Sequence, residues 1–203
     1  MISEPLAARK CALRRTVIEL RSQVDLSRAQ AAAQAVAVHV SRLAQFAAAE
    51  SVALYVPRPD SGELDSYPLF EIAGQMGKRR LLPRCTEAVE LEYVRVEDWE
   101  SLQPGRYGIP EPRGESVSLP GSESLVVCPG VAFDASGGRL GMGKGYFDRT
   151  FSACGKERAF LVGVGYACQI VEDLPKQEHD QPMDAVVTED GLVKLRLGDF
   201  SHD

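Results

Sequence analysis

Apolar residues near the start of the chain recur at the spacing of an α-helix. Successive apolar positions are separated by 7, 4, 3 and 4 residues, which places them on one helical face: Leu6, Leu13, Val17, Leu20 and Val24. Residues 25–28 interrupt this pattern, and Ser27 followed by Gln30 has the form of a capping box that opens a second helix. That helix is rich in alanine, and we expect it to run from Ala31 to Ala49.

After residue 50 the pattern changes to short apolar runs that end at proline, glycine or charged residues. Runs of this length are typical of buried strands. We expect strands over 52–56, 80–83, 125–128, 160–164 and 185–187, an edge strand over 91–95, and helices over 66–76 and 146–153. Residues 101–122 hold four prolines and four glycines, so we expect an ordered loop there.

Short apolar strands that alternate with helices predict an α/β fold. We expect a three-layer sandwich around a mostly parallel sheet, preceded by the N-terminal helical pair. The chain has 203 residues, which fits one large domain, and we assign residues 1–203 to a single domain.

Composition and charge exclude several classes of protein. Hydrophobic residues make up 44% and charged residues 26%, as in ordinary globular proteins. The net charge of −6 argues against non-specific nucleic-acid binding, and no apolar run approaches the roughly 20 residues that span a bilayer. The five cysteines, at positions 11, 85, 128, 154 and 168, form no Cys-x-x-Cys pair. This favours reduced thiols over disulfides or a zinc site. With no apolar signal sequence at the N-terminus, we expect a cytoplasmic protein.

The strongest chemical motif is a glycine-rich segment at residues 138–148, Gly-Arg-Leu-Gly-Met-Gly-Lys-Gly-Tyr-Phe-Asp. It follows an expected strand and opens an expected helix. Glycines allow the backbone to wrap closely around a ligand, and free N–H groups there suit a phosphate. Arg139 and Lys144 add positive charge. The spacing matches neither a Walker A loop nor a dinucleotide fingerprint, and a simple tight turn is the alternative.

The first helix carries a second candidate site for an anion. Lys10, Arg14 and Arg21 lie together beside the apolar stripe on a helical wheel. Lys10 and Arg14 are four residues apart, so their charges can converge on one anion. A solvated basic edge is the alternative interpretation.

Acidic residues supply candidates for a metal site or a polar substrate. Asp148 directly follows the glycine-rich segment, where a carboxylate can hold Mg²⁺ against phosphates. Asp180 lies in a loop beside His179, and Glu63 and Asp65 follow the first expected strand. Ligands of α/β proteins bind at that edge of the sheet. Each of these residues alone is also consistent with a cap or a surface position.

Taken together, the ordered motifs resemble one family. They are Lys10-x-x-Leu13-Arg14, Glu63-Leu64-Asp65, Leu82-Pro83-Arg84, Tyr107-Gly108-Ile109-Pro110-Glu111-Pro112, Pro129 to Asp134, Arg139 to Asp148, and His179-Asp180 with Asp184 to Thr188. From Lys10 to Thr188 the chain is similar to the 5-formyltetrahydrofolate cyclo-ligases, also called methenyltetrahydrofolate synthetases. Phe147 departs from the family, in which many members have tyrosine.

The resemblance implies an enzyme that converts 5-formyltetrahydrofolate to 5,10-methenyltetrahydrofolate, with ATP as co-substrate and Mg²⁺ as cofactor. It places the ATP at Lys10, Arg14, Arg139, Leu140, Gly141, Met142, Gly143, Lys144, Gly145, Tyr146 and Phe147. It places the folate at Val56, Glu63, Tyr107, Met142, Gly143, Lys144, Gly145 and Tyr146. Tyr146 and Lys144 are the expected catalytic residues, and Asp148 and Asp180 the expected metal ligands.

The residues agree with such chemistry because no Ser-His-Asp or Cys-His arrangement is evident, and phosphorylation of the formyl oxygen followed by attack of N10 needs no protein nucleophile. The expected partners are the two small-molecule substrates, without nucleic acid or membrane, and we expect a monomer. Two alternatives stay open. One is a non-catalytic nucleotide- or folate-binding protein on the same fold, and the other is a sugar-phosphate isomerase or acyl-CoA-handling enzyme on a similar sheet.

Overall fold

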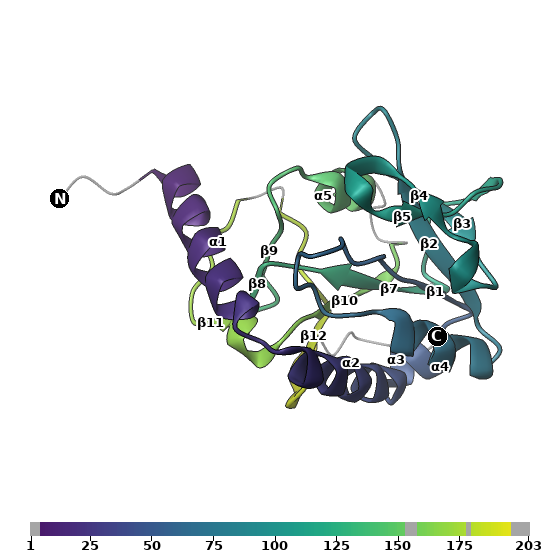
Figure 1. Ribbon diagram of the computed structural model, residues 1–203, viewed down its shortest axis with the longest axis horizontal. Helices are drawn as coiled ribbons and strands as arrows, with labels where there is room; N and C mark the ends of the chain where they lie inside the picture. Colours follow the sequence, from purple (N-terminus) through teal and green to yellow (C-terminus); the bar gives the residue numbers. More distant parts are fainter. Residues whose placement is uncertain (1–4, 153–157, 178–179, 196–203) are drawn as a thin grey trace, which may run out of the picture.

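A large, mostly parallel sheet forms the centre of the computed structural model, which describes residues 5–152, 158–177 and 180–195 (Figure 1). The strand order is β13-β12-β10-β7-β1-β2-β3-β6, in which the five strands from β12 to β2 are parallel. The strands of this sheet are β1 (Ser51–Ala53), β2 (Arg79–Cys85), β3 (Leu91–Arg95), β6 (Ser116–Val117), β7 (Ser124–Pro129), β10 (Phe160–Val164), β12 (Ala185–Thr188) and β13 (Gly191–Leu195).

Smaller elements surround this sheet. A three-stranded sheet contains β8 (Ala132–Asp134), β9 (Arg139–Leu140) and β11 (Ile170–Val171), and a two-stranded one contains β4 (Gln103–Pro104) and β5 (Pro110–Glu111). The helices are α1 (Leu6–Ser22), α2 (Leu26–Ser41), α3 (Ala44–Ala48), α4 (Tyr67–Gln75) and α5 (Tyr146–Ser152). Short 3₁₀ turns are η1 (Trp99–Ser101), η2 (Arg106–Gly108) and η4 (Ala167–Gln169).

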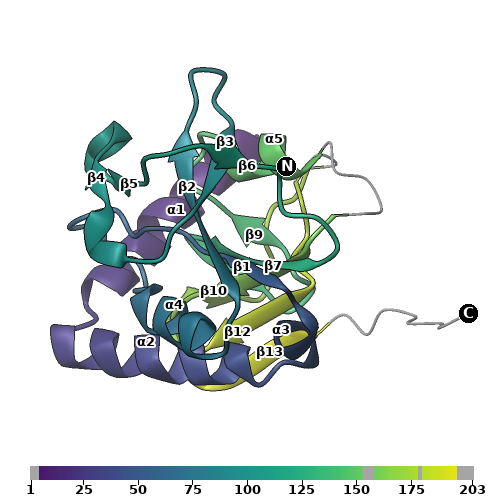
Figure 2. The ribbon, with the colours of Figure 1, turned by 90° about the vertical axis from the view of Figure 1, so that its right-hand side faces the viewer.

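The two faces of the central sheet are covered by different helices (Figure 2). Alternate residues of β1 and β7, among them Val52 and Val127, belong to the cluster that contains α2, α3 and α4. Their neighbours Ala53 and Val126 belong to the cluster on the other face, with Phe151 of α5. This alternation is the two-residue period of a strand that is buried on both sides.

The chain connections create a crevice at the carboxyl ends of β1 and β7. The β1-α4-β2 connection leads along the sheet in one direction, and the β7-α5-β10 connection leads in the other. Strand–helix–strand units are almost always right-handed, so units that run in opposite directions put their helices on opposite faces. The two connections therefore diverge between β1 and β7, which is where open α/β sheets bind ligands.

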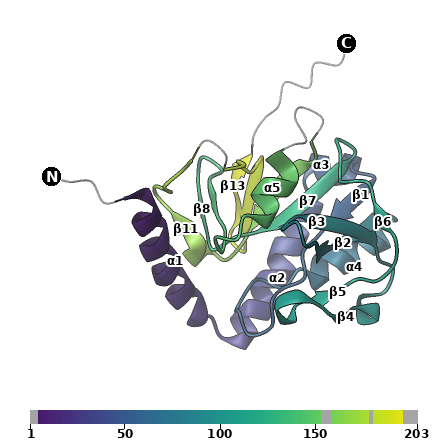
Figure 3. The same ribbon diagram turned by 90° about the horizontal axis from the view of Figure 1, so that it is seen from above.

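Helix α1 lies to one side of the sheet, next to β8 and β11 (Figure 3). Its buried residues are Lys10, Val17 and Arg21, whereas Leu20 is exposed. Val17 packs in a small satellite cluster with Leu140 of β9. The face of α1 that contacts the protein is thus rotated from the apolar stripe towards the charged residues.

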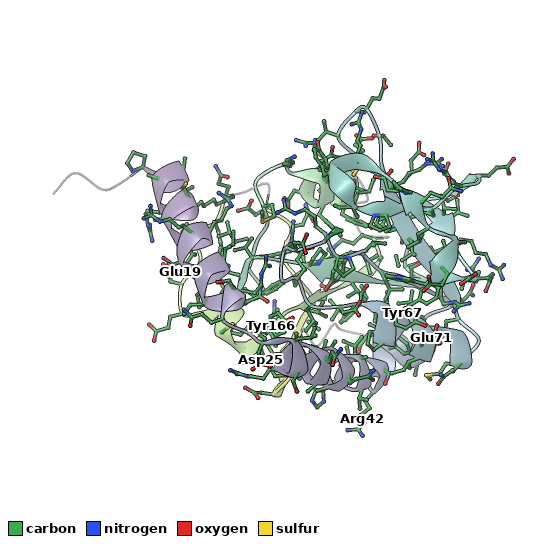
Figure 4. The ribbon with its side chains drawn as sticks, in the orientation of Figure 1. Glu19, Asp25, Arg42, Tyr67, Glu71 and Tyr166 are labelled. Atoms are coloured by element: carbon green, nitrogen blue, oxygen red, sulfur yellow. The ribbon has the colours of Figure 1, made fainter. Side chains whose placement is uncertain are left out.

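The second N-terminal helix differs from the prediction at both ends. It begins at Leu26, because the Asp25 side chain caps it by accepting a hydrogen bond from the Arg28 N–H at 2.9 Å (Figure 4). The capping box at Ser27 and the continuous helix to Ala49 are therefore wrong. The chain breaks at Arg42 and restarts as α3. On one straight helix Phe46 would point roughly 120° away from Val40, and the break lets both reach the core.

Some of the other predicted elements are confirmed by the structure, and others are not. The strand over 160–164 and the helix near 66–76 are confirmed as β10 and α4, and Gly77 ends α4 with a φ of +71°. The strand over 91–95 is confirmed as β3, but it is not an edge strand, because β6 pairs with it on its outer side. That β6 lies in the segment 101–122, which also holds β4 and β5 rather than loop alone. The predicted end of the last helix, Ala153, lies outside the described residues.

Gln169 connects the end of β7 to the loop after β10. Its side chain is 1% exposed and donates to the carbonyls of Gly130 and Val131, at 2.8 and 2.9 Å, while its Oε1 accepts from the Tyr166 N–H at 2.9 Å. Gly130 lines the crevice. This amide therefore helps to fix one wall of the site.

We predict that Gln169→Leu lowers the free energy of unfolding by about 3 kcal/mol or more, because each buried group left without a partner costs about 1–3 kcal/mol. Urea denaturation followed by circular dichroism measures the effect. Gln75→Leu, at an exposed position of α4, is the matched control. Equal midpoints for the two variants would contradict this role of Gln169.

Candidate functional site

A pocket of about 400 Å³ opens at the carboxyl ends of β1, β2 and β7. Every residue that the family resemblance assigns to the site lines it: Lys10, Arg14, Val56, Glu63, Tyr107, Arg139, Leu140, Gly141, Met142, Gly143, Lys144, Gly145, Tyr146, Phe147, Asp148 and Asp180. The candidates Arg21 and Asp65 are not among the lining residues. These residues come from α1, the loop after β1, η2, the β9–α5 segment and the loop before β12. The fold thus brings together side chains separated by up to 170 positions.

The β9–α5 segment presents free backbone donors to the pocket. Gly143 and Gly145 have φ values of +91° and +70°, and residues other than glycine adopt such values only with strain. Within the described residues, the N–H groups of residues 141–145 donate no hydrogen bond to the protein. Such donors at a loop preceding a helix suit an anionic group.

The start of this segment is held by Asp134. Its Oδ1 accepts from the backbone N–H groups of Ser136 and Gly138, at 2.9 and 2.8 Å, and its Oδ2 pairs with Lys176 at 2.8 Å. Burial alone would raise the pKa of this carboxyl, but the hydrogen bonds from Lys176, Ser136 and Gly138 outweigh burial and lower it. The carboxylate therefore stays ionised and fixes the turn that leads into β9.

Helix α1 contributes two cations to the pocket, the buried Lys10 and the half-buried Arg14. Lys10 is 8% exposed, and its Nζ lies 2.7 Å from Asp180 Oδ2 and 3.0 Å from Gln177 Oε1. Arg14 donates from Nε to the Gly141 carbonyl at 2.8 Å. Lys10 and Arg14 thus converge on the pocket, and the alternative of a solvated basic edge does not hold for Lys10.

Arg21 has a different position from the other two cations. It is 3% exposed, does not line the pocket, and donates from Nη2 to the Ser61 carbonyl at 2.7 Å. Ser61 belongs to the loop that carries Glu63. The same loop is tied by the Tyr55 hydroxyl, which donates to the Leu64 carbonyl. Arg21 therefore positions a wall of the pocket and is not placed to bind an anion there.

A second ion pair lies on the floor of the pocket. Arg139 Nη2 is 2.9 Å from Asp148 Oδ1, Nη1 donates to the Pro129 carbonyl at 3.3 Å, and the guanidinium lies 5.3 Å from the centre of the Phe147 ring. Its buried Nε has no hydrogen-bond partner.

Aromatic groups and one lysine form the exposed mouth of the pocket. Lys144 Nζ lies 3.3 Å from the centre of the Tyr107 ring, and the Tyr107 and Tyr146 hydroxyl oxygens are 3.2 Å apart. Tyr107 is 51% exposed and has a φ of +57°. The hydrogen bond between them and the Lys144 charge lower the pKa of Tyr107, whereas the bond raises the pKa of Tyr146.

Comparison with known proteins agrees with this arrangement. Residues 7–189 match the model of the 5-formyltetrahydrofolate cyclo-ligase family. The chain belongs to this family. It is 34% identical over 169 residues to a probable 5-formyltetrahydrofolate cyclo-ligase of Schizosaccharomyces pombe, covering 76% of this chain and 82% of the relative. It is 40% identical over 131 residues to the 5-formyltetrahydrofolate cyclo-ligase of Escherichia coli, covering 63% and 72%.

Solved structures of cyclo-ligase relatives have the same fold. The NMR structure of Aquifex aeolicus 5,10-methenyltetrahydrofolate synthetase superposes with a TM-score of 0.77 and 34% identity, over 96% of each chain. A Mycoplasma pneumoniae protein described as a 5,10-methenyltetrahydrofolate synthetase has a TM-score of 0.66 at 19% identity, over 89% of this chain and 98% of that one. At that identity the second likeness concerns the fold alone.

The cyclo-ligase pocket also contains residues that the sequence analysis did not assign to it. They are Tyr55, Arg58, Ser61, Pro83, Cys85, Leu91, Ile109, Glu111, Pro129, Gly130 and Gln177. Most lie within one or two positions of a family-like motif, so the motifs themselves were the available signal. His179 and Cys154 lie outside the described residues. The other four cysteines are free, and none of the described helices is long and apolar enough to cross a membrane.

The two predicted metal ligands, Asp148 and Asp180, fit Mg²⁺ by their chemistry. Both carboxylates line the pocket, and in each the second oxygen accepts no hydrogen bond from the described residues. Among those residues no group of three acidic, histidine or cysteine side chains converges. Mg²⁺ in nucleotide sites is commonly held by one or two carboxylates and the phosphates, so two carboxylates are sufficient.

We predict that Tyr146→Phe raises the pKa of Tyr107, because the Tyr107 phenolate loses the hydroxyl that donates to it. Alkaline absorbance titration measures this, and the difference from a Tyr107→Phe titration isolates Tyr107 among the six tyrosines. Lys144→Met should raise the same pKa. Tyr67→Phe, on α4, is the control and should leave it unchanged. A Tyr107 pKa that is unchanged in Tyr146→Phe would contradict the contact.

Proposed function

We propose that this chain converts 5-formyltetrahydrofolate and ATP to 5,10-methenyltetrahydrofolate, ADP and phosphate. The observation that carries the proposal is one pocket that combines cations of α1, unbonded N–H groups of residues 141–145, and a carboxylate and aromatic ring from other elements. Membership of the cyclo-ligase family supports it, as do the names of the relatives. The chain is accordingly a ring-forming ligase.

The nucleotide is assigned to the side of the pocket formed by α1 and the β9–α5 segment. Lys10, Arg14 and Arg139 would neutralise the phosphates, and the N–H groups of residues 141–145 would bind their oxygens. The position of Arg139 in the lining of the pocket supports this assignment. Lys144 would move from the Tyr107 ring to the transferring phosphoryl group, while the Tyr146 hydroxyl donates a hydrogen bond beside it.

Mg²⁺ would be held by Asp148 and Asp180. When bound it would supply positive charge that offsets the phosphate oxygens. Both carboxylates now pair with Arg139 and Lys10. A ligand that brings its own phosphates and metal would therefore exchange partners with two ion pairs, and Arg14 and Lys144 would offset the phosphate charge that remains.

The folate is assigned to the opposite side, near Glu63, Val56 and Tyr107. The Glu63 carboxylate is fixed by the Arg58 N–H, which donates to Oε2 at 2.9 Å. A carboxylate in this position suits the donor-rich edge of a pterin. Tyr107 offers a ring face at the mouth, and Met142 to Tyr146 lie between the two substrates.

The reaction needs positioning and charge neutralisation more than covalent participation by the protein. The formyl oxygen attacks the γ-phosphorus of ATP, and ADP leaves. The resulting iminium phosphate is electrophilic at carbon, so the N10 of the same molecule attacks it. Phosphate then leaves with the former formyl oxygen, and the five-membered ring is closed.

Three broader descriptions belong to the same proposal. We describe the fold as a three-layer sandwich with an N-terminal helical pair, and residues 1–203 as one domain. We further propose a cytoplasmic monomer that acts on small molecules. The two faces of the sheet with their separate helices support the layered description.

Turnover with and without ATP tests the function. We predict that the purified chain forms the methenyl product, detected by its absorbance, with one ADP per product and none when ATP is omitted. Binding of ATP or folate without product would instead identify a non-catalytic binding protein. An ATP-independent reaction would point to an isomerase or acyl-CoA chemistry.

We predict that two variants, one on each wall of the pocket, weaken the binding of different substrates. Arg14→Ala should raise the KM for ATP roughly tenfold to a hundredfold, because a charge-assisted contact contributes about 1.5–3 kcal/mol. Glu63→Gln should raise chiefly the KM for 5-formyltetrahydrofolate. Arg9→Ala, on the exposed part of α1, and Asp60→Asn, in the Glu63 loop, are the controls outside the pocket. The assignment is wrong if the two variants affect the other substrate instead.

A further inference from the structure

Glu111 is a half-buried carboxylate in the wall of the pocket formed by β2 and β5. Its Oε1 accepts a hydrogen bond from the Cys85 N–H at 3.2 Å, and its side chain lies directly over Gly105, where a Cβ would be 2.4 Å from Cγ. Prolines at positions 110 and 112 restrict the backbone on either side. The carboxylate is therefore rigidly placed.

Glu111 differs from Asp148 and Asp180 in having no cation partner among the described residues, a lack that it shares with Glu63. Asp148 and Asp180 form ion pairs with Arg139 and Lys10, whereas Glu111 forms none with the residues that the structure describes. A partly desolvated carboxylate without a cation is unfavourable. A substrate that offers a proton or a positive charge at this position would remove that cost.

The two titratable neighbours of Glu111, the Cys85 thiol and the Tyr146 phenol, both have raised pKa values. Burial, and then the Glu111 charge, raise the pKa of the Cys85 thiol, while the hydrogen bond to Tyr107 raises the pKa of Tyr146. Arg106, the cation near Cys85, donates to the Thr86 carbonyl at 3.0 Å. Leu91 and Ile109 add apolar surface to the same lining. Neither the thiol nor the Tyr146 phenol is thus suited to accept a proton near neutral pH.

Ring closure requires that a proton be removed. The N10 of the substrate carries one hydrogen, and its lone pair forms the new bond to the formyl carbon. The nitrogen would then carry both the hydrogen and a positive charge. Loss of that proton restores the N10 lone pair, which helps to break the carbon–oxygen bond to phosphate. The product keeps one positive charge, shared over N5, the bridging carbon and N10.

We propose that Glu111 is the general base that accepts the N10 proton during ring closure. The inference rests on the proposed function and names a catalytic residue in addition to Tyr146 and Lys144. Glu63 is assigned to the pterin edge, so Glu111 is the remaining pocket carboxylate without a cation partner among the described residues. After the proton has moved, phosphate leaves and the neutral Glu111 returns its proton to solvent.

Glu111→Gln is the decisive variant, because the amide oxygen can still accept from the Cys85 N–H but the group cannot take a proton. General-base catalysis typically contributes at least a hundredfold. We expect kcat to fall by about a hundredfold or more, with both KM values within about threefold of wild type. Because phosphorylation precedes proton removal, ADP released per methenyl product should rise as trapped intermediate returns to 5-formyltetrahydrofolate by hydrolysis.

The pH profile separates this role from a structural one. Because a general base acts only without its proton, kcat of the wild type should fall on the acid side, and this acid limb should be absent from Glu111→Gln. Glu111→Asp should retain the limb at reduced kcat, and it also serves if the amide variant does not fold. Glu115→Gln, exposed in the same segment, should behave as wild type.

A near-normal kcat in Glu111→Gln, or in Glu111→Asp if only that variant folds, would overturn the assignment, as would an acid limb that persists in the amide variant. A lower kcat with one ADP per product and an unchanged pH profile would contradict the role as a base. It would indicate that Glu111 only supports the contact between β2 and β5. Absence of ATP-dependent product with the wild-type chain would be a failure of the proposed function itself.

Discussion

Two crossover connections that leave the neighbouring strands β1 and β7 in opposite directions determine where this protein can bind a ligand. Each connection must be right-handed, so α4 and α5 cover opposite faces of the sheet. Neither helix then covers the carboxyl ends of these two strands. The opening is a consequence of chain topology and does not depend on which side chains line it. The loops that follow β1 and β7 are the ones that enter it.

Helix α1 completes the pocket from outside the main core. Only a small satellite cluster around Val17 and Leu140 holds it by apolar contacts. Its polar contacts reach both walls: Lys10 contacts Asp180 and Arg14 contacts Gly141 on the proposed nucleotide side, and Arg21 contacts the loop that carries Glu63. One rigid helix therefore sets the spacing between the two proposed substrate sites, and its buried face is charged for that reason.

Charge compensation explains how so many ionised groups can share one pocket. Lys10 with Asp180 and Arg139 with Asp148 are neutral pairs that each place one proposed phosphate ligand beside one proposed metal ligand. Binding of ATP with Mg²⁺ would exchange these partners, and Arg14 and Lys144 would offset the phosphate charge that remains. Glu111 belongs to neither of these ion pairs. Its lack of a cation among the described residues is consistent with a partner that belongs to the folate.

The sequence by itself determined the α/β class, several strands and many of the residues that line the pocket. Each depends on local pattern: β10 is a bounded apolar run, Gly77 ends α4, and the glycine-rich segment needs backbone conformations that few other residues adopt. Tertiary structure decided the rest. Strand β6 is too short to give a pattern, and it became visible only by pairing with β3. The break at Arg42 exists because Val40 and Phe46 must both reach one core. The different roles of Lys10 and Arg21 depend on partners far away in the chain, which no local pattern encodes. The same holds for the surroundings of Glu111, which forms no ion pair with the residues that the structure describes.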